Sequence, residues 1–122
     1  MWSYQQSTGK MLDSSGGLFA TGYSGHGAGV NNPALQTARD IGPIPQGVWK
    51  MTTWIEHHPH LGLGVIPLEQ IEGDSFGRSG FFLHGDTAAH NQSASHGCII
   101  LGAAWQRQEM WAGGDRTINV VV

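Results

Sequence analysis

Hydrophobic and polar residues alternate along several short stretches of this chain, with the two-residue period of a β-strand that buries one face. Turn residues separate these stretches, as in the Ser-Thr-Gly sequence at residues 7–9. The expected strands cover residues 2–6, 10–12, 17–23, 48–55, 63–71 and 117–122. The first two strands predict a hairpin, and the β-branched run at 117–122 predicts a strand that closes the sheet.

Two further segments are short and continuously apolar, which is typical of buried strands. They are residues 81–83 and 99–101. Each has a chemically reactive residue at one end, because His84 follows the first segment and Cys98 precedes the second. The stretch from residue 81 to residue 101 therefore carries the candidate chemistry.

Beyond Leu101 the period changes from that of a strand to that of a helix. Residues 102–112 predict an amphipathic helix of about three turns with residues 106–109 on its polar side. Gly113-Gly114 is expected to end it, and one shorter helical turn is expected within residues 33–39. The predicted fold class is mainly β, a β-sandwich or flattened barrel with one short helix after the cysteine motif.

The length of 122 residues fits one domain, residues 1–122, which is large enough for a core without metals or disulfides. Only 12% of the residues are charged and the net charge is −3, which argues against nucleic acid as a partner. No apolar run approaches the roughly 18 residues of a membrane span. Met1 is followed by Trp-Ser-Tyr-Gln rather than by a signal peptide, so export is expected to use another route.

Cys98 is the one cysteine of the chain, so it cannot form an internal disulfide. A cysteine with a histidine nearby in the fold is a candidate nucleophile and base. The alternative is a small buried hydrophobic residue beside a structural histidine. Gly97 favours the nucleophile, because glycine leaves room for a substrate carbonyl. It also lets the N–H groups of Gly97 and Cys98 point together at an oxyanion.

His84 and His96 are both close enough in sequence to serve as the base, and a neighbouring imidazolium would lower the pKa of the thiol. His96 precedes Cys98 by two residues and would share its face on an extended strand. His84 comes from a separate segment and can face the sulfur across a strand pair. We expect His84 to be the base, with its ring held by the carbonyl of Gly85, and His96 to support the anion site.

Two other clusters invite a functional interpretation. The glycine-rich residues 22–29 have no Lys-Ser/Thr after them, so a phosphate cradle is disfavoured. A close-packed loop and a substrate-lining loop both stay open, with His26 as a solvated residue in it. His57, His58 and His60 suggest a metal, but Pro59 breaks helical geometry, and an exposed loop is expected instead. No metal and no cofactor are expected.

A family resemblance rests on three motifs. Ser95-His96-Gly97-Cys98-Ile99, preceded by His84-Gly85, resembles the active-site signature of the YkuD-type L,D-transpeptidases. Residues 44–49, Ile-Pro-Gln-Gly-Val-Trp, are similar to the T-P-x-G-x-Y segment that leads into a strand in those domains. Gly25-x-Gly27-x-x-x-Asn31, followed by Gly-Pro-Ile-Pro at 42–45, resembles a compact branch of type VI secretion effectors. The chain departs from the pattern at Ile100, where the family commonly has arginine, and in its short interval between histidine and cysteine.

The resemblance implies a peptidoglycan stem peptide as substrate. Cys98 would attack the carbonyl on the L-centre of the diamino acid at stem position three, and His84 would protonate the leaving D-alanine. Water, a D-amino acid or a second stem would then resolve the acyl-enzyme. The resemblance also implies an antibacterial effector made in the cytoplasm without a Sec signal and acting in the periplasm of a target bacterium. It leaves an immunity protein open as a partner, and it places Ser95, Asn31 and Gly27 at the substrate.

Stem peptides carry carboxylates, so some cation is expected to replace the arginine that Ile100 lacks. Lys10, Arg107 and Arg116 lie away from the motifs, which leaves Arg39, Lys50 and Arg78. Arg78 is expected near the mouth of the strand pair, where its planar fork could bind a carboxylate; a solvated turn residue is the alternative. Two other functions stay open, a non-catalytic peptidoglycan-binding module and a cysteine endopeptidase or amidase acting on another wall amide.

Overall fold

The computed structural model describes residues 1–86 and 97–122. In chain order the first strands are β1 (Trp2–Gln5), β2 (Lys10–Leu12), β3 (Leu18–Thr21), β4 (Tyr23–Ser24) and β5 (Gly47–Met51). They are followed by β6 (Ile55–His58), β7 (Gly62–Gly73), β8 (Phe82–His84), β9 (Ile99–Ile100) and β10 (Thr117–Val121). Two 3-10 turns, η1 (Gly27–Gly29) and η2 (Pro33–Leu35), precede β5, and the helix α1 (Ala104–Ala112) lies between β9 and β10. Within these residues the protein is mainly β with one short α-helix, as predicted.

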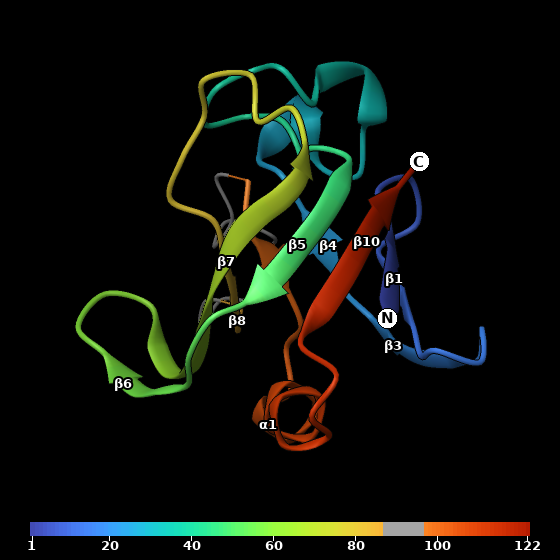
Figure 1. Cartoon of the computed structure of the whole chain (residues 1–122). Coiled ribbons are helices and arrows are strands. Elements are labelled where there is room, and N and C mark those ends of the chain that lie inside the picture. Colours follow the sequence, from blue (N-terminus) through green and yellow to red (C-terminus); the bar gives the residue numbers. More distant parts are fainter. Residues whose placement is uncertain (87–96) are drawn as a thin grey trace.

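The strands form one sheet in the order β3-β2-β1-β10-β5-β7-β8-β9-β4, with β6 added to β7. Most neighbours are antiparallel, but β1 pairs with β10 and β8 pairs with β9 in parallel. Figure 1 shows β7, β5, β10 and β1 side by side, with α1 below one end of the sheet and the 3-10 turns at the other. The hairpin of β6 and β7 projects from the body.

The sheet is nearly closed into a barrel because its two edge strands are consecutive in the chain. One residue, Gly22, separates β3 at one edge from β4 at the other. Its N–H donates to the carbonyl of Gly9 over 2.8 Å, on the β3 side. A side chain at Gly22 would overlap with the carbonyl of Ile100 on the β4 side. Only glycine therefore lets the chain cross from one edge to the other here.

The sequence prediction differs from the structure in three strands. Residues 17–23 were expected as one strand, yet they divide at Gly22 into β3 and β4, which occupy opposite edges. Residues 48–55 belong to two strands, since β5 ends at Met51 and Ile55 begins β6. β7 extends over 12 residues, beyond the expected 63–71. Alternation marks strand propensity well, but it does not show where a strand changes its partner.

The main core is built mostly from alternate residues of the strands, with Met110 from α1 and with Ile44 and Leu101 from the segments between elements. Its buried members include Tyr4, Met11, Ile44, Trp49, Met51, Ile66, Leu83, Ile99, Leu101, Met110, Ile118 and Val120. A second, smaller cluster consists of Tyr23, Cys98 and Ile100, with Val30 and Phe82 packed against it. The candidate nucleophile therefore belongs to a separate layer from the main core. Among the described residues, α1 is too short to cross a membrane.

Candidate active site

β8 and β9 bring the candidate histidine and cysteine to one face of the sheet. The two strands are parallel, with Leu83 opposite Ile99 and His84 opposite Ile100. Leu83 and Ile99 point into the main core. Because side chains alternate along a strand, His84 and Ile100 point to the other face, and so does Cys98, two residues before Ile100. The expectation that His84 faces the cysteine's side across a strand pair agrees with this register.

The His84 ring is buried and held in one orientation. The side chain is 2% exposed, and its Nδ1 lies 2.9 Å from the carbonyl oxygen of Gly85. A carbonyl only accepts hydrogen bonds, so Nδ1 carries the proton and Nε2 keeps its lone pair. Nε2 is buried without a hydrogen-bond partner among the residues that the structure describes. The expected contact between Gly85 and the His84 ring is present.

The environment of His84 keeps the ring neutral. Burial lowers the pKa of His84 most, the carbonyl of Gly85 raises it, and the electrostatic effects of Arg107 and His58 lower it further. Asp86 raises it slightly, and its carboxylate also accepts a hydrogen bond from the Tyr23 hydroxyl over 2.7 Å. The net shift of the pKa is downward. His84 is thus set up as a proton acceptor at neutral pH.

Cys98 is a buried thiol rather than a preformed thiolate. Its side chain is 9% exposed, and the thiol points to the carbonyl of Gly80 over 3.7 Å. Burial raises the pKa of Cys98 to about 11, while the backbone of Phe82 and the charge of Arg78 lower it. The sequence suggested that a histidine cation would lower this pKa. In the described part of the chain, the cation that does so is Arg78.

Gly97 is required for a reason that the sequence did not indicate. Its φ is +128°, and an added Cβ would overlap with Nη2 of Arg78 and lie 3.2 Å from the Phe81 ring. The side-chain space at Gly97 is therefore filled by Arg78 and Phe81, and is not an open path for a substrate carbonyl. Ser24 fixes the other side, because its hydroxyl donates to the carbonyl of Gly97 over 3.2 Å.

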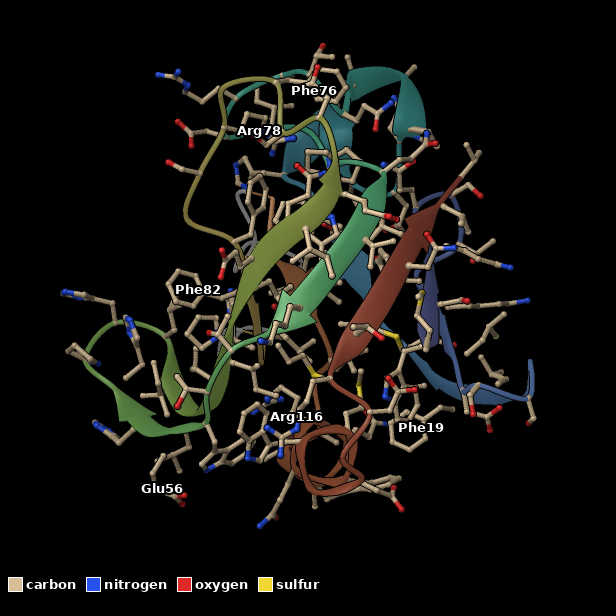
Figure 2. All side chains as sticks on the ribbon, viewed as in Figure 1. Phe19, Glu56, Phe76, Arg78, Phe82 and Arg116 are labelled. Atoms are coloured by element: carbon tan, nitrogen blue, oxygen red, sulfur yellow. The ribbon has the colours of Figure 1, made fainter. Side chains whose placement is uncertain are left out.

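Arg78 is not a solvated turn residue, so that alternative is wrong. It is 6% exposed, and the centre of its guanidinium lies 5.2 Å from the centre of the Phe81 ring. Nη1 donates to the carbonyls of Gln36 and Pro43 over 2.6 and 2.8 Å, and Nη2 donates to Gly42 over 2.9 Å. In Figure 2, Arg78 lies between the turn after β7 and the segment that leads into β5. It connects residues 36–43 to Gly97.

Arg107 is the residue that sequence reasoning missed. It was assigned to the polar side of the helix, yet it is 3% exposed. Its guanidinium donates to the carbonyls of Leu63, Gly64 and Leu101. A Cβ on Gly85 would lie 3.1 Å from Nη1 of Arg107, so the guanidinium packs against the glycine that holds His84. Arg107 lies three residues before Met110, so the two share one helix face. Because Met110 is also buried, this spacing was the signal in the sequence that could have indicated the burial of Arg107.

The glycine-rich loop is close-packed in part. Side chains at Gly25 and Gly29 would overlap with backbone carbonyls, whereas a Cβ on Gly27 would meet nothing within 4 Å. The side chain of Asn31 accepts a hydrogen bond from the N–H of Ser24 over 3.1 Å. Because the Ser24 hydroxyl donates to the carbonyl of Gly97, Ser24 links Asn31 to Gly97. The expected Ser95 and His96 lie outside the described residues.

Two hollows lie beside the turn that carries Arg78 and Ser79. One, of about 310 Å³, is lined by Trp49, Leu68, Gln70, Ser75, Arg78, Ser79, Gly80 and Phe81. The other, of about 190 Å³, is lined by Arg39, Asp40, Gly77, Arg78 and Ser79. The larger hollow includes Gly80, the contact of the Cys98 thiol, and both share Arg78 and Ser79. Arg39 and Arg78 therefore face one polar space, and Lys50 does not line it.

Among the histidines of residues 57–60, His58 stabilises the turn between β6 and β7. Nδ1 of His58 accepts hydrogen bonds from the N–H groups of His60 and Leu61, both over 3.1 Å. The His58 ring also lies 5.6 Å from the ring of Phe82, which belongs to the second cluster. Within the described residues, no group of three or more histidine, cysteine or acidic side chains is arranged to hold a metal.

Comparison with known proteins gives one family. The model of the Tlde1 domain matches residues 19–122, which include all but the first residue of β3, the strands β4 to β10 and both candidate catalytic residues. No curated protein matches the chain.

Proposed function

Because the chain belongs to the Tlde1 domain family, a type VI secretion effector family of peptidoglycan-acting toxin domains, we propose that it is a cysteine acyl-transferase. Its substrate would be the peptidoglycan stem peptide, and the bond cleaved would join the diamino acid to D-alanine. This is the chemistry of the YkuD-type L,D-transpeptidases, whose cysteine and histidine motif the sequence resembles. The observation that carries the proposal is a neutral, oriented His84 on the same face of the sheet as Cys98.

The reaction begins with proton transfer within the neutral pair. The thiol of Cys98 gives its proton to Nε2 of His84 as the sulfur attacks the amide carbonyl on the L-centre of the diamino acid. The N–H groups of Gly97 and Cys98 hold the resulting oxyanion, and His96 supports them. The C–N bond then breaks, and His84 returns the proton to the amine of the leaving D-alanine. A thioester on Cys98 remains.

The second half of the reaction resolves the thioester. A nucleophile attacks its carbonyl while His84 takes the proton from that nucleophile, and the Cys98 sulfur leaves and is reprotonated. Water gives an L,D-carboxypeptidase, a D-amino acid gives exchange, and the amine of a second stem gives a 3–3 crosslink. All three outcomes share the same first step, so the site residues are common to them.

The substrate would lie along the two hollows that share Arg78 and Ser79. The 310 Å³ hollow reaches Gly80, next to the sulfur, and the polar hollow would receive a carboxylate. A contact between this carboxylate and Arg78 stays a prediction, with Arg39 as the second cation of the same hollow. Ser95 and the open side of Gly27 would line the peptide, and Asn31 would act through Ser24.

The biological setting follows from this substrate. The protein would act in the periplasm of a target bacterium after contact-dependent secretion, as an antibacterial toxin. A producing cell would then need an immunity protein as its partner.

The test is incubation with purified tetrapeptide and pentapeptide stems, followed by mass analysis. The proposal predicts loss or exchange of the terminal D-alanine of the tetrapeptide and no such product with Cys98→Ala protein. Cleavage at another amide would instead favour an endopeptidase or amidase. Binding of stems without any product would favour a non-catalytic module.

A further inference from the structure

Two arginines are buried on opposite sides of the candidate pair. Arg78 packs against Gly97 and Arg107 packs against Gly85. Each donates hydrogen bonds to three backbone carbonyls. Carbonyls satisfy the N–H groups of a guanidinium but do not cancel its charge. Burial lowers the pKa of both arginines, but a guanidinium stays protonated at neutral pH.

The two charges act on different groups. Arg78 lowers the pKa of Cys98, and the presence of a cysteine anion raises the pKa of Arg78 in return. Arg107 lowers the pKa of His84 and is not among the groups that shift Cys98. Proximity agrees with this division, because Nη2 of Arg78 fills the side-chain space of the residue next to Cys98.

Within residues 1–86 and 97–122, the other groups named on the side of the sulfur come from three elements. β8 contributes His84 and the backbone of Phe82, β4 contributes Tyr23, and the turn before β8 contributes the carbonyl of Gly80. The Tyr23 hydroxyl donates to Asp86, and Asp86 is not among the groups that shift the pKa of Cys98. Asp40 lines the same hollow as Arg78 and raises the pKa of Arg78. Arg78 is the cation in this set.

We propose that Arg78 is the positioning residue of the nucleophile, and that its fixed guanidinium stabilises the anion that forms on Cys98 during attack. Three carbonyls and the Phe81 ring prevent the guanidinium from moving away, so its charge is already oriented when the proton leaves the sulfur. The guanidinium is buried and packs against Gly97, the residue next to Cys98, so its charge is less screened there than it would be at the surface. The inference rests on the proposed role of Cys98, but not on the identity of the substrate.

The titration of Cys98 by iodoacetamide tests this role, with the rate followed by intact mass from pH 7 to pH 10. Cys98→Ala protein gives the background. Loss of the charge in Arg78→Gln should raise the pKa of Cys98 and slow alkylation roughly tenfold at pH 8, about one pKa unit. A merely structural role predicts the reverse, because an opened site would lower the pKa towards its ordinary value near 8.5 and speed alkylation.

Arg107→Gln is the matched control. It also removes a buried guanidinium with three carbonyl contacts, so it should cost comparable stability, but the titration of Cys98 should stay as in the wild type. Arg78→Lys keeps the charge while weakening the same contacts, and it should alkylate within about threefold of the wild-type rate. This variant decides the question if Arg78→Gln does not fold.

An Arg78→Gln protein that alkylates as fast as the wild type, or faster, would overturn the inference. So would an Arg107→Gln protein with the same slowing, since the effect would then be general. Alkylation needs no stem peptide. A failed stem-peptide assay with normal Arg78 results would therefore count against the substrate alone.

Discussion

The carbonyl oxygen of Gly85 lies 2.9 Å from Nδ1 of His84, and this contact decides which ring nitrogen can act as a base. It places the proton on Nδ1 and leaves the lone pair on the buried Nε2. In a triad this orienting task belongs to a third side chain, such as a carboxylate. Here a backbone group does it, so no substitution at position 85 can remove the acceptor itself.

His84 should matter more than His96 for turnover. Removal of a general base typically costs about 10²- to 10⁴-fold in rate, whereas a support of the anion site overlaps with backbone donors. We would compare kcat/KM on tetrapeptide for His84→Ala and His96→Ala. A more severe loss in the His96 variant would reverse the assignment of roles.

Cys98→Ala should abolish turnover and leave the fold intact. Cys98 is one of three buried residues in the small second cluster. The substitution removes the sulfur and leaves a methyl group, so it should cost about 1 kcal/mol of unfolding free energy. Thermal denaturation checks the fold, and product analysis checks the chemistry. Any retained product formation at the wild-type rate would remove Cys98 as the nucleophile.

The acid side of the pH profile should report His84. Its pKa is lowered by burial, so kcat/KM should rise with pH and the midpoint of this rise should lie below the ordinary value of about 6.5. Asp86 raises the pKa of His84, and therefore Asp86→Asn should move this rise to still lower pH. His58→Gln should move it to higher pH, because His58 acts in the opposite direction.

The control for these shifts is the titration of Cys98 itself, which neither variant should change. A rise centred above pH 7 in the wild type would mean that the group that must lose its proton is not a His84 with a lowered pKa, and the neutral-pair mechanism would be wrong.

Gly97→Ala should be more damaging than Gly77→Ala. Both glycines have positive φ, +128° and +72°, so both substitutions carry a backbone cost of about 1 kcal/mol. Position 77 has open space for a Cβ, but at position 97 it would overlap with Arg78. The clash should add roughly 1–3 kcal/mol and displace Arg78. Equal unfolding free energies for the two variants would show that the contact between Arg78 and Gly97 is loose.

The sequence indicated the main features of the fold because alternation and apolar runs report directly on burial. It also indicated the cysteine and the histidine, since a single cysteine after glycine and a histidine at a strand end are local features. The contact between Gly85 and His84 was predictable for the same reason, because both atoms lie within two consecutive residues.

What the sequence could not show depends on contacts between distant residues. The crossing at Gly22 joins two sheet edges, so its reason lies at Ile100, 78 positions away by residue number. Arg78 and Arg107 resemble surface residues in any hydropathy pattern, because the carbonyls that receive them come from other segments. Position 97 likewise needs a glycine because Arg78 fills the space of a side chain there, and Arg78 lies too far away in the sequence for a local pattern around Cys98 to include it.

The central claim is that Cys98 carries an acyl group during turnover, and rapid mixing with a tetrapeptide stem tests it most directly. The protein is quenched within the first turnovers and its intact mass is measured. We predict a hydroxylamine-sensitive adduct on Cys98, with the mass of the tetrapeptide after loss of D-alanine, in the wild type and not in Cys98→Ala. Release of D-alanine by Cys98→Ala protein at the wild-type rate would contradict the account.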